Sequence, residues 1–345
     1  VLTAGQTFIL GYTNEEDGIY KADKDSPTII FDDFTTSFHW VDFDFKVKSS
    51  AMKMLRPKST FEGSFKYIFY AMECIHFEAV NHTRHWISKY SQFEIPLPHP
   101  VVQEEIVKIL DRFAEYAAEL QAELQARQEQ YEYYRNKLLT FNEIEGGGIQ
   151  GAIWMKMSEI GTFIRGKRFV RTDIVNDGVP CIHYGDMYTY YGLYATKSKG
   201  MLRNELAPKM RYAQKNDVVI VAAGENKEDI GIGMAWLGDE PAAVHDACFI
   251  FKSDLYPQYV SHYLRTNYYH KQIVKHVSEG KICSISAKGL GNAIIPIPPY
   301  EEQVRIATQL NKFDALVSDL VQGLPAEIAA VQKQYEYYRD KLLSF

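Results

Sequence analysis

The stretch QYEYYRNKLL fills residues 130–139 and QYEYYRDKLL fills residues 334–343, so only Asn136 and Asp340 differ. A second pair of matching segments precedes them. FEIPLPHPVVQEEIVKILDRF (93–113) aligns with AIIPIPPYEEQVRIATQLNKF (293–313) at an offset of 200 residues, and the offset has grown to 204 at the decapeptides. A chain that repeats both segments in the same order is predicted to be a duplication, with four residues added to the second copy.

Two long helices are predicted to follow the Pro-x-Pro breaks of these segments. A β-like segment precedes each break, because proline interrupts a strand but is tolerated where a helix begins. Apolar residues then recur every three or four positions along 101–141 and 301–345, the heptad pattern of helices that pack together. The apolar seam of the second helix includes Leu320. The tripeptide GLP then interrupts the pattern and predicts a break in the helix near 323–325. Because the two seams match, we expect antiparallel packing.

The decapeptides place tyrosines on the predicted seam and an arginine beside it. Aromatic rings there bury a large area while their hydroxyls reach the edge of the seam. The arginines are expected to be free to pair with acids of the partner helix or of a docked subunit. The predicted spacer and partner-docking residues are Tyr131, Tyr134, Arg135, Tyr335, Tyr338 and Arg339.

Two similar globular domains account for the remaining sequence. They are expected at 1–100 and 154–300, with a glycine-rich linker at 142–153. VLTAGQTFILGYT (1–13) lines up with CIHYGDMYTYYGL (181–193), and SPTIIFDDF (26–34) lines up with NDVVIVAAG (216–224) as a buried strand that enters a loop. Nothing in the first copy corresponds to 154–180, so the first domain is expected to lack its N-terminal part. The predicted fold class is α+β, with pseudo-two-fold symmetry.

This order of domains and helices, with IPIPPYEEQVRIATQL (295–310) and QYEYYRDKLL at the joints, resembles the specificity subunit of type I restriction-modification systems. The resemblance implies that each globular part is a target recognition domain that reads one half of a split site in double-stranded DNA. It implies that the helices form a spacer and dock two methyltransferase subunits, through which restriction subunits join. S-adenosylmethionine, ATP and Mg²⁺ are then implied for the partners, while this chain binds no cofactor and works in a bacterial or archaeal cytoplasm.

Local charge agrees with DNA binding although the net charge is −6. Residues 45–68 contain six basic residues and one acid, and residues 163–215 contain ten basic residues and four acids. Residues 103–132, in the first predicted helix, contain eight acids and three basic residues. The acidity therefore lies in the helices, and the predicted domains carry the charge that attracts phosphates.

Four loops are predicted to contact DNA: DDFTTSFH (32–39), HTRHWISKY (82–90), GENKED (224–229) and GKICSISAK (280–288). Asparagine and lysine make directed contacts to base edges, and basic and tyrosine side chains contact the backbone. The alternative is that these are ordinary solvated loop residues. The candidates are Thr35, Thr36, Lys46, Lys48, Arg84, Lys89, Arg165, Lys167, Arg168, Tyr188, Asn226, Lys227, Lys281 and Lys288.

Two other functions remain as alternatives. Asp42, Asp44 and Lys46 would share one face of a strand, as in metal-dependent nucleases, but the second copy has no equivalent. The other alternative is a coiled-coil scaffold without a role on DNA, which the basic segments disfavour. No phosphate-binding GxxxxGK[ST] loop and no methyltransferase motif occurs, so we predict no catalytic or metal-binding residue. The four scattered cysteines fit reduced thiols of a cytosolic protein.

Overall fold

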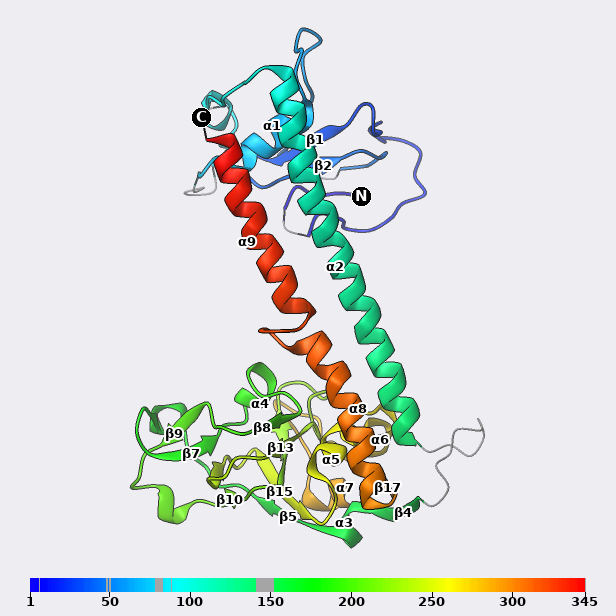
Figure 1. Ribbon diagram of the computed structural model, residues 1–345, viewed down its shortest axis with the longest axis vertical. Helices are drawn as coiled ribbons and strands as arrows, with labels where there is room; N and C mark the ends of the chain where they lie inside the picture. Colours follow the sequence, from blue (N-terminus) through cyan, green and yellow to red (C-terminus); the bar gives the residue numbers. More distant parts are fainter. Residues whose placement is uncertain are drawn as a thin grey trace. The chain divides into compact units, whose positions relative to one another are not determined.

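The computed structural model describes residues 1–5, 7–47, 49, 51–77, 83–87, 89–140 and 152–344 (Figure 1). The chain divides into two compact units, with Val1–Ala122 and Ala326–Phe345 in unit 1 and Glu123–Pro325 in unit 2. Each unit therefore combines one globular part with portions of both long helical segments. The predicted linker at 142–153 lies almost wholly outside the described residues. Among those residues, no helix has the length and apolar composition needed to cross a membrane.

The helical segments are α2 (Pro100–Thr140), α8 (Tyr300–Ser318) and α9 (Leu324–Leu343). The interruption between α8 and α9 covers 319–323, slightly earlier than the pattern predicted. There the Asp319 carboxylate accepts hydrogen bonds from the backbone N–H groups of Val321 and Gln322, at 2.7 and 3.2 Å. Pro325 belongs to the first turn of α9, where its missing N–H has no helical partner to lose. Leu320 is 80% exposed, so its predicted place on the seam is wrong.

The helices pack with opposite chain directions within each unit. In unit 1, Phe113 of α2 stacks on Tyr338 of α9, and Ile106 and Leu110 share an apolar cluster with Leu343. Residue numbers rise along α2 as they fall along α9. In unit 2, Tyr134 of α2 stacks on Phe313 of α8 in the same antiparallel sense.

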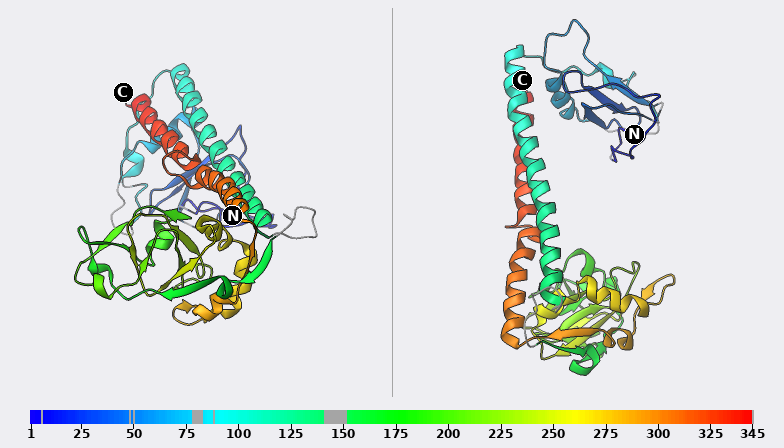
Figure 2. Two further views of the ribbon diagram at one scale, coloured as in Figure 1. Left: turned by 60° about the horizontal axis from the view of Figure 1, so that its bottom comes forward. Right: turned by 90° about the vertical axis from the view of Figure 1, so that its right-hand side faces the viewer.

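Unit 1 contains a three-stranded antiparallel sheet with β1 (Thr28–Asp32) between β2 (Phe38–Val41) and β3 (Met52–Leu55). Helix α1 (Phe65–Glu73) begins after Ser64, whose hydroxyl accepts the Tyr67 N–H and caps the helix. One face of α1 packs on α2 and α9, and Met72 on another face joins the cluster beneath β1. Figure 2 shows these layers in its right-hand view, with α1 beside α2 and the strands beyond it.

Unit 2 contains two five-stranded sheets. The first has the order β5-β15-β11-β13-β8, and the second has the order β10-β14-β7-β9-β6. The strands of the first sheet are β5 (Gly161–Arg165), β8 (Tyr194–Ala195), β11 (Val218–Val221), β13 (Gly233–Trp236) and β15 (Cys248–Ser253). Those of the second are β6 (Ile174–Val175), β7 (Val179–Ile182), β9 (Gly200–Leu202), β10 (Tyr212–Ala213) and β14 (Ala242–Val244).

Short helices and strand pairs complete unit 2. Helix α5 (Pro257–Tyr263) is buried along its whole length, because it packs between the first sheet and α8. The Thr266 and Ser286 hydroxyls cap the two helices that follow them. The remaining elements of unit 2 are β4 (Ile153–Lys156), α3 (Met157–Ile160), α4 (Asp186–Thr189), β12 (Ala223–Gly224), α6 (Asn267–Ile273), β16 (Cys283–Ser284), α7 (Ala287–Gly291) and β17 (Ile294–Ile297), with short 3-10 turns Arg171–Asp173, Ala207–Lys209 and Val274–His276. Unit 1 has a 3-10 turn at Tyr90–Gln92.

The duplication extends to strand order and hydrogen bonds. The antiparallel order β2-β1-β3 of unit 1 returns in unit 2 as β13-β11-β15. The hydroxyls of Tyr67 and Tyr259 donate to the Pro96 and Pro296 carbonyls, both at 2.8 Å. The β-like segments differ, however. β17 pairs with β4, whereas residues 93–99 form no strand and have none beside them among the described residues.

Candidate nucleic-acid interface

Three connections of unit 2 meet at one edge of its first sheet. Because β5, β15 and β11 are antiparallel neighbours, the end of β5, the start of β15 and the end of β11 lie together. Backbone hydrogen bonds join these connections: Gly166 N–H donates to Cys248 O at 3.0 Å, and Ala222 N–H donates to Ala247 O at 2.8 Å. We call residues 165–168, 222–229 and 245–247 the loop edge of unit 2.

The connection after β5 gives the loop edge its basic charge. The Arg165 guanidinium donates to the carbonyl of Asp246 at 2.8 Å, so this side chain holds the edge together. Lys167 and Arg168 are exposed, and within the described part of the chain neither forms an ion pair. Their charges are therefore available to a ligand, whereas Arg165 is partly committed to the fold.

Two neutral histidines stiffen this region. His183 and His245 follow the parallel strands β7 and β14, and their rings lie 4.7 Å apart. Burial lowers the pKa of His183 to about 4 and also lowers the pKa of His245, which nearby Asp246 opposes only in part. A contact of 3.2 Å between His245 and Asp246 is therefore not a full ion pair at neutral pH. The Nδ1 atom of His183 accepts the Gly185 N–H, and that of His245 accepts the Ala247 N–H. Each histidine therefore holds the loop that follows its strand.

The fold brings two of the predicted reading loops together. β12 pairs with β16, so GENKED leaves this ribbon beside the start of GKICSISAK, and Lys227 forms an ion pair with Glu279. The Asn226 amide donates to Asp229 at 3.1 Å within its own loop. Tyr188 of α4 packs closely on the same ribbon. A Cβ atom added to Gly224 would stand only 2.6 Å from the Tyr188 hydroxyl oxygen. Tyr188, Asn226 and Lys227 thus form one cluster.

The remaining candidates of this region separate. Lys281 is exposed two residues before β16 and so belongs to the same ribbon. Lys288 is exposed on α7, which packs against α3 instead. The structure therefore unites Tyr188, Asn226, Lys227 and Lys281, and it places Lys288 on a different element.

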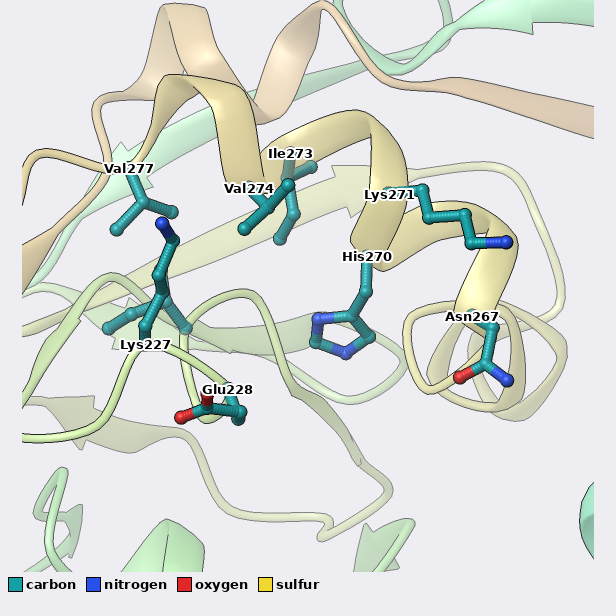
Figure 3. A pocket seen from close by; sticks show the side chains of 9 residues that line it. Lys227, Glu228, Asn267, His270, Lys271, Ile273, Val274 and Val277 are labelled. Carbon is teal, nitrogen blue, oxygen red and sulfur yellow. The ribbon is translucent and has the colours of Figure 1, made fainter.

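A hollow of about 390 Å³ opens beside Lys227 (Figure 3). Both apolar side chains and polar or charged side chains of the loop and of α6 line it. In Figure 3 the Lys227 side chain extends toward Val274 and Val277, opposite His270 and Lys271. The sequence reasoning missed the α6 residues, although the basic run HKQIVKH (270–276) was a usable signal. The lining residues are Lys227, Glu228, Ile230, Asn267, His270, Lys271, Ile273, Val274 and Val277.

The corresponding loop of unit 1 joins β1 to β2. The Asp32 carboxylate accepts the N–H groups of Phe34 and Thr35, and Thr36 has a φ of +60°, so this is a tight turn with Thr35 exposed at its tip. Buried Asp33 binds the second predicted loop of unit 1, residues 82–90. Its carbonyl accepts the His85 N–H and its carboxylate accepts the Trp86 N–H. Both predicted loops of unit 1 are therefore neighbours.

The lysines of unit 1 differ in availability. Lys46 forms an ion pair with Glu15 and donates to the Asp17 carbonyl at 2.9 Å, so its charge is already partnered. Lys48 and His82 lie outside the described residues. Arg84 and Lys89 are exposed, and the Lys89 ammonium lies 5.8 Å from the Phe77 ring centroid.

Residues 42–46, expected as an alternating strand with a nuclease-like face, form only an isolated bridge at Phe45, and their charges lie in separate ion pairs. Asp44 pairs with Lys21 at 2.6 Å, and this hydrogen bond lowers the pKa of the Asp44 carboxyl group. Lys46 pairs with Glu15 instead of Asp42 or Asp44. In the parts of the chain that the structure describes, no three His, Cys, Asp or Glu side chains are placed to hold a metal ion. The four cysteines are free.

The predicted docking residues are only partly exposed. The side chains of Arg135 and Arg339 are 13% and 17% exposed. Arg339 lies 3.8 Å from Glu73 of α1, so its acid comes from the globular part and not from the partner helix or a docked subunit as expected. Both arginines are held because the helix ends pack on the globular parts. Of the predicted tyrosines, Tyr134 (36%) and Tyr338 (42%) are exposed, but their neighbours Tyr133 (58%) and Tyr337 (59%), which the heptad pattern assigned to no role, are more exposed. Lys137 and Lys341 lie over these rings at 5.5 and 5.6 Å.

Sequence comparison identifies relatives of the chain. Residues 154–330 match the family described as the type I restriction modification DNA specificity domain. The specificity subunit of the type I restriction enzyme EcoR124I/EcoR124II of Escherichia coli is 39% identical over 361 residues, which span 100% of this chain and 86% of that protein. A putative type I restriction enzyme specificity subunit of Haemophilus influenzae is 31% identical over 274 residues, covering 75% of this chain and 65% of the relative.

Solved structures share the fold at low sequence identity. A chain from a structure of complex assembly and conformational transition in the type I system has a TM-score of 0.62 and 16% identity, covering 96% of this chain and 84% of that chain. The S subunit of a type I restriction-modification system from M. genitalium has a TM-score of 0.56 and 16% identity, with coverage of 99% and 87%. These likenesses agree with the predicted α+β class of two domains joined by helices.

Proposed function

The chain belongs to the family of type I restriction-modification specificity subunits, and from this premise we propose how its two units recognise DNA. It is the subunit that recognises the DNA sequence within a type I restriction-modification complex. Each unit reads one half of a bipartite site in double-stranded DNA, through the loops that follow its central strand. The observation that carries this proposal is the shared strand order, in which equivalent loops leave β1 and β11.

Phosphate contacts and base contacts come from different parts of the unit 2 loop edge. Lys167 and Arg168 are exposed cations without an ion pair in the described structure, so they suit phosphates. Asn226 and Lys227 stand on the loop beside Gly224 and Tyr188. Their amide and ammonium groups, which pair with Asp229 and Glu279 in the free chain, suit base edges once those exposed pairs are exchanged. The hollow beside Lys227 adds apolar surface next to these polar groups. In unit 1, Thr35 and Thr36 occupy the equivalent turn.

The partners are the methyltransferase and restriction subunits of the complex. We assign the methyltransferase docking surface to the exposed helix ends around Tyr133 and Tyr337, whose nearly equal exposure suits two copies of one subunit. S-adenosylmethionine, ATP and Mg²⁺ act in the partner subunits, and this chain contributes recognition without catalysis. The assembled complex works in the cytoplasm, where its DNA lies.

Domain exchange tests the proposal. Residues 180–295 are replaced by the same region of another specificity subunit, and the methylated bases in the genome of cells with the complete system are mapped. We expect one half-site to change while the other half-site and the spacing stay the same. The reciprocal control replaces residues 1–95 and changes the other half-site. A simultaneous change of both halves after either exchange would contradict independent reading.

A further inference from the structure

The repeat makes three positions of unit 1 equivalent to three positions of unit 2. Tyr67 and Tyr259 make the same hydrogen bond from α1 and α5, so Glu73 corresponds to Arg265. The stacked pairs Phe113–Tyr338 and Phe313–Tyr134 make Ala114 correspond to Asp314 and Arg339 correspond to Arg135. Both helix ends therefore have an arginine at the equivalent position, whereas the other two equivalent positions differ in charge between the units.

In unit 1 the acid beside the helix-end arginine comes from the globular part, whereas Asp111 of α2 accepts a hydrogen bond from Tyr70. The Tyr335 hydroxyl donates to the Glu73 carboxylate, and Arg339 lies 3.8 Å from the same carboxylate. Burial raises the pKa of Glu73, and the hydrogen bond of Tyr335 and the charge of Arg339 oppose that rise. Arg339 also pairs with Asp340 at 2.8 Å, while the α2 position equivalent to Asp314 is the exposed Ala114.

In unit 2 the acid comes from the helix. Arg265 replaces the glutamate and donates to the Gly192 carbonyl at 2.9 Å. The Asp314 carboxylate accepts from the Ser318 hydroxyl at 3.2 Å, and the nearby charges of Arg265 and Arg135 oppose the rise in its pKa that burial causes. The Nε atoms of Arg135 and Arg265 are buried without a hydrogen-bond partner, so this junction depends on the nearby charge of Asp314.

The one difference between the decapeptides lies at the same junctions. Asp340 accepts from Arg339 in unit 1. Asn136 has no charge, and its carbonyl oxygen accepts the Asn267 N–H at 3.0 Å in unit 2. The sequence difference between the two helix ends is therefore part of the charge difference between the two junctions.

We propose that each globular part is matched to its own helices by the side on which a partly buried acid is placed: the pair Glu73/Ala114 in unit 1 and the pair Arg265/Asp314 in unit 2. Glu73 and Asp314 are positioning residues that hold the helix-end arginine against the domain. One consequence concerns domain exchange. A crossover at residue 95 or 295 separates the members of a pair, so an exchanged domain needs the matching residue at 114 or 314. Only this consequence rests on the proposed function.

Moving the acid across each junction tests the proposal in the full chain. R265E places an acid beside Asp314, and E73R places an arginine beside Arg339. We expect each variant to lower the thermal unfolding midpoint by about 5 °C or more, since a buried charge without compensation is strongly destabilising. R265E/D314A recreates the arrangement of unit 1, and E73R/A114D recreates that of unit 2. Each double variant should recover more than half of the loss.

The single variants D314A and A114D are the matched controls, because each changes the acid without the compensating partner. Recovery by the double variants beyond the sum of the single effects supports the matching. Double variants as unstable as R265E or E73R, or failing to fold as those do, overturn it. Thermal unfolding needs no DNA, so a chain that shows the recovery but binds no DNA would refute the proposed function and leave the matching intact.

Discussion

The ring of Phe113 stacks on the ring of Tyr338, with centroids 5.5 Å apart and an interplanar angle of 25°. The repeat reproduces this pair as Phe313 and Tyr134, at 5.7 Å and 23°. In each unit the first residue follows the Pro-x-Pro break of one helical segment, and the second lies in the decapeptide of the other. The two repeated sequence segments are therefore packing partners of each other, which explains why both were kept.

The first prediction concerns phosphate contacts. The double variant K167E/R168E should weaken DNA binding by the assembled complex and reduce the slope of log K against log salt by about two, one for each lost phosphate contact. Titration of DNA at several salt concentrations measures this slope. K215E is the control, because Lys215 precedes β11 at the opposite end of the strand and pairs with Asp239 at 2.7 Å. An unchanged slope in K167E/R168E would show that these cations are only solvated.

The second prediction concerns the glycine beneath Tyr188. G224A places a Cβ atom 2.6 Å from the Tyr188 hydroxyl oxygen, so the tyrosine or the loop must shift. We expect weaker binding to the half-site read by unit 2, with the other half-site still recognised. G224A/Y188F should recover affinity because it removes the obstructing hydroxyl. G280A is the control in the neighbouring loop, where the nearest atom to an added Cβ is 3.9 Å away. If G224A and G280A behave alike, the Tyr188 cluster does not shape the reading loop.

The third prediction concerns the exposed aromatics at the helix ends. Y133A and Y337A should each leave the unfolding midpoint nearly unchanged, because both rings are mostly exposed, but each should remove one methyltransferase subunit from the complex. The double variant should bind neither copy. Mass measurement of the purified complex reads the stoichiometry. K333A is an exposed control on α9. Full occupancy in the double variant would exclude these tyrosines from the docking surface.

The fourth prediction concerns pH. His262 is fully buried, and burial lowers its pKa to about 3 from an ordinary value of 6.5. In the neutral form with the proton on Nε2, the ring donates to Asn311 and accepts from Tyr131. Below pH 6.5 the unfolded chain binds a proton that the folded chain excludes. The stability contributed by this residue is therefore complete above pH 6.5, and falls as pH drops toward 3, by at most about 1.4 kcal/mol per pH unit.

Unfolding midpoints between pH 7.5 and 5 test this prediction. H262Q should be less stable at pH 7.5 but should lose less stability on acidification. H276Q is the comparison variant, at a histidine that is partly exposed. Equal pH dependence in H262Q and the parent chain would mean that His262 is not the buried proton acceptor responsible.

Local and repeated patterns were enough to predict much of the architecture. The Pro-x-Pro breaks preceded α2 and α8 as predicted, since proline acts on the backbone of its own residue and its neighbours. The decapeptides and heptad seams indicated antiparallel helices, because period and repetition are properties of the sequence itself. The alignment of 26–34 with 216–224 also predicted buried strands, and these are β1 and β11.

Exposure and charge pairing were decided only by the tertiary structure. Lys46 is partnered by Glu15 and Lys227 by Glu279, and no local pattern links residues so far apart in the chain. The heptad rule placed Leu320 in the seam, but the interrupted helix leaves it exposed. The sequence alone determined that the chain is duplicated and which segments are equivalent. Only long-range packing, which buries side chains and pairs their charges, decided that the helix-end arginines face the globular parts while Tyr133 and Tyr337 face solvent.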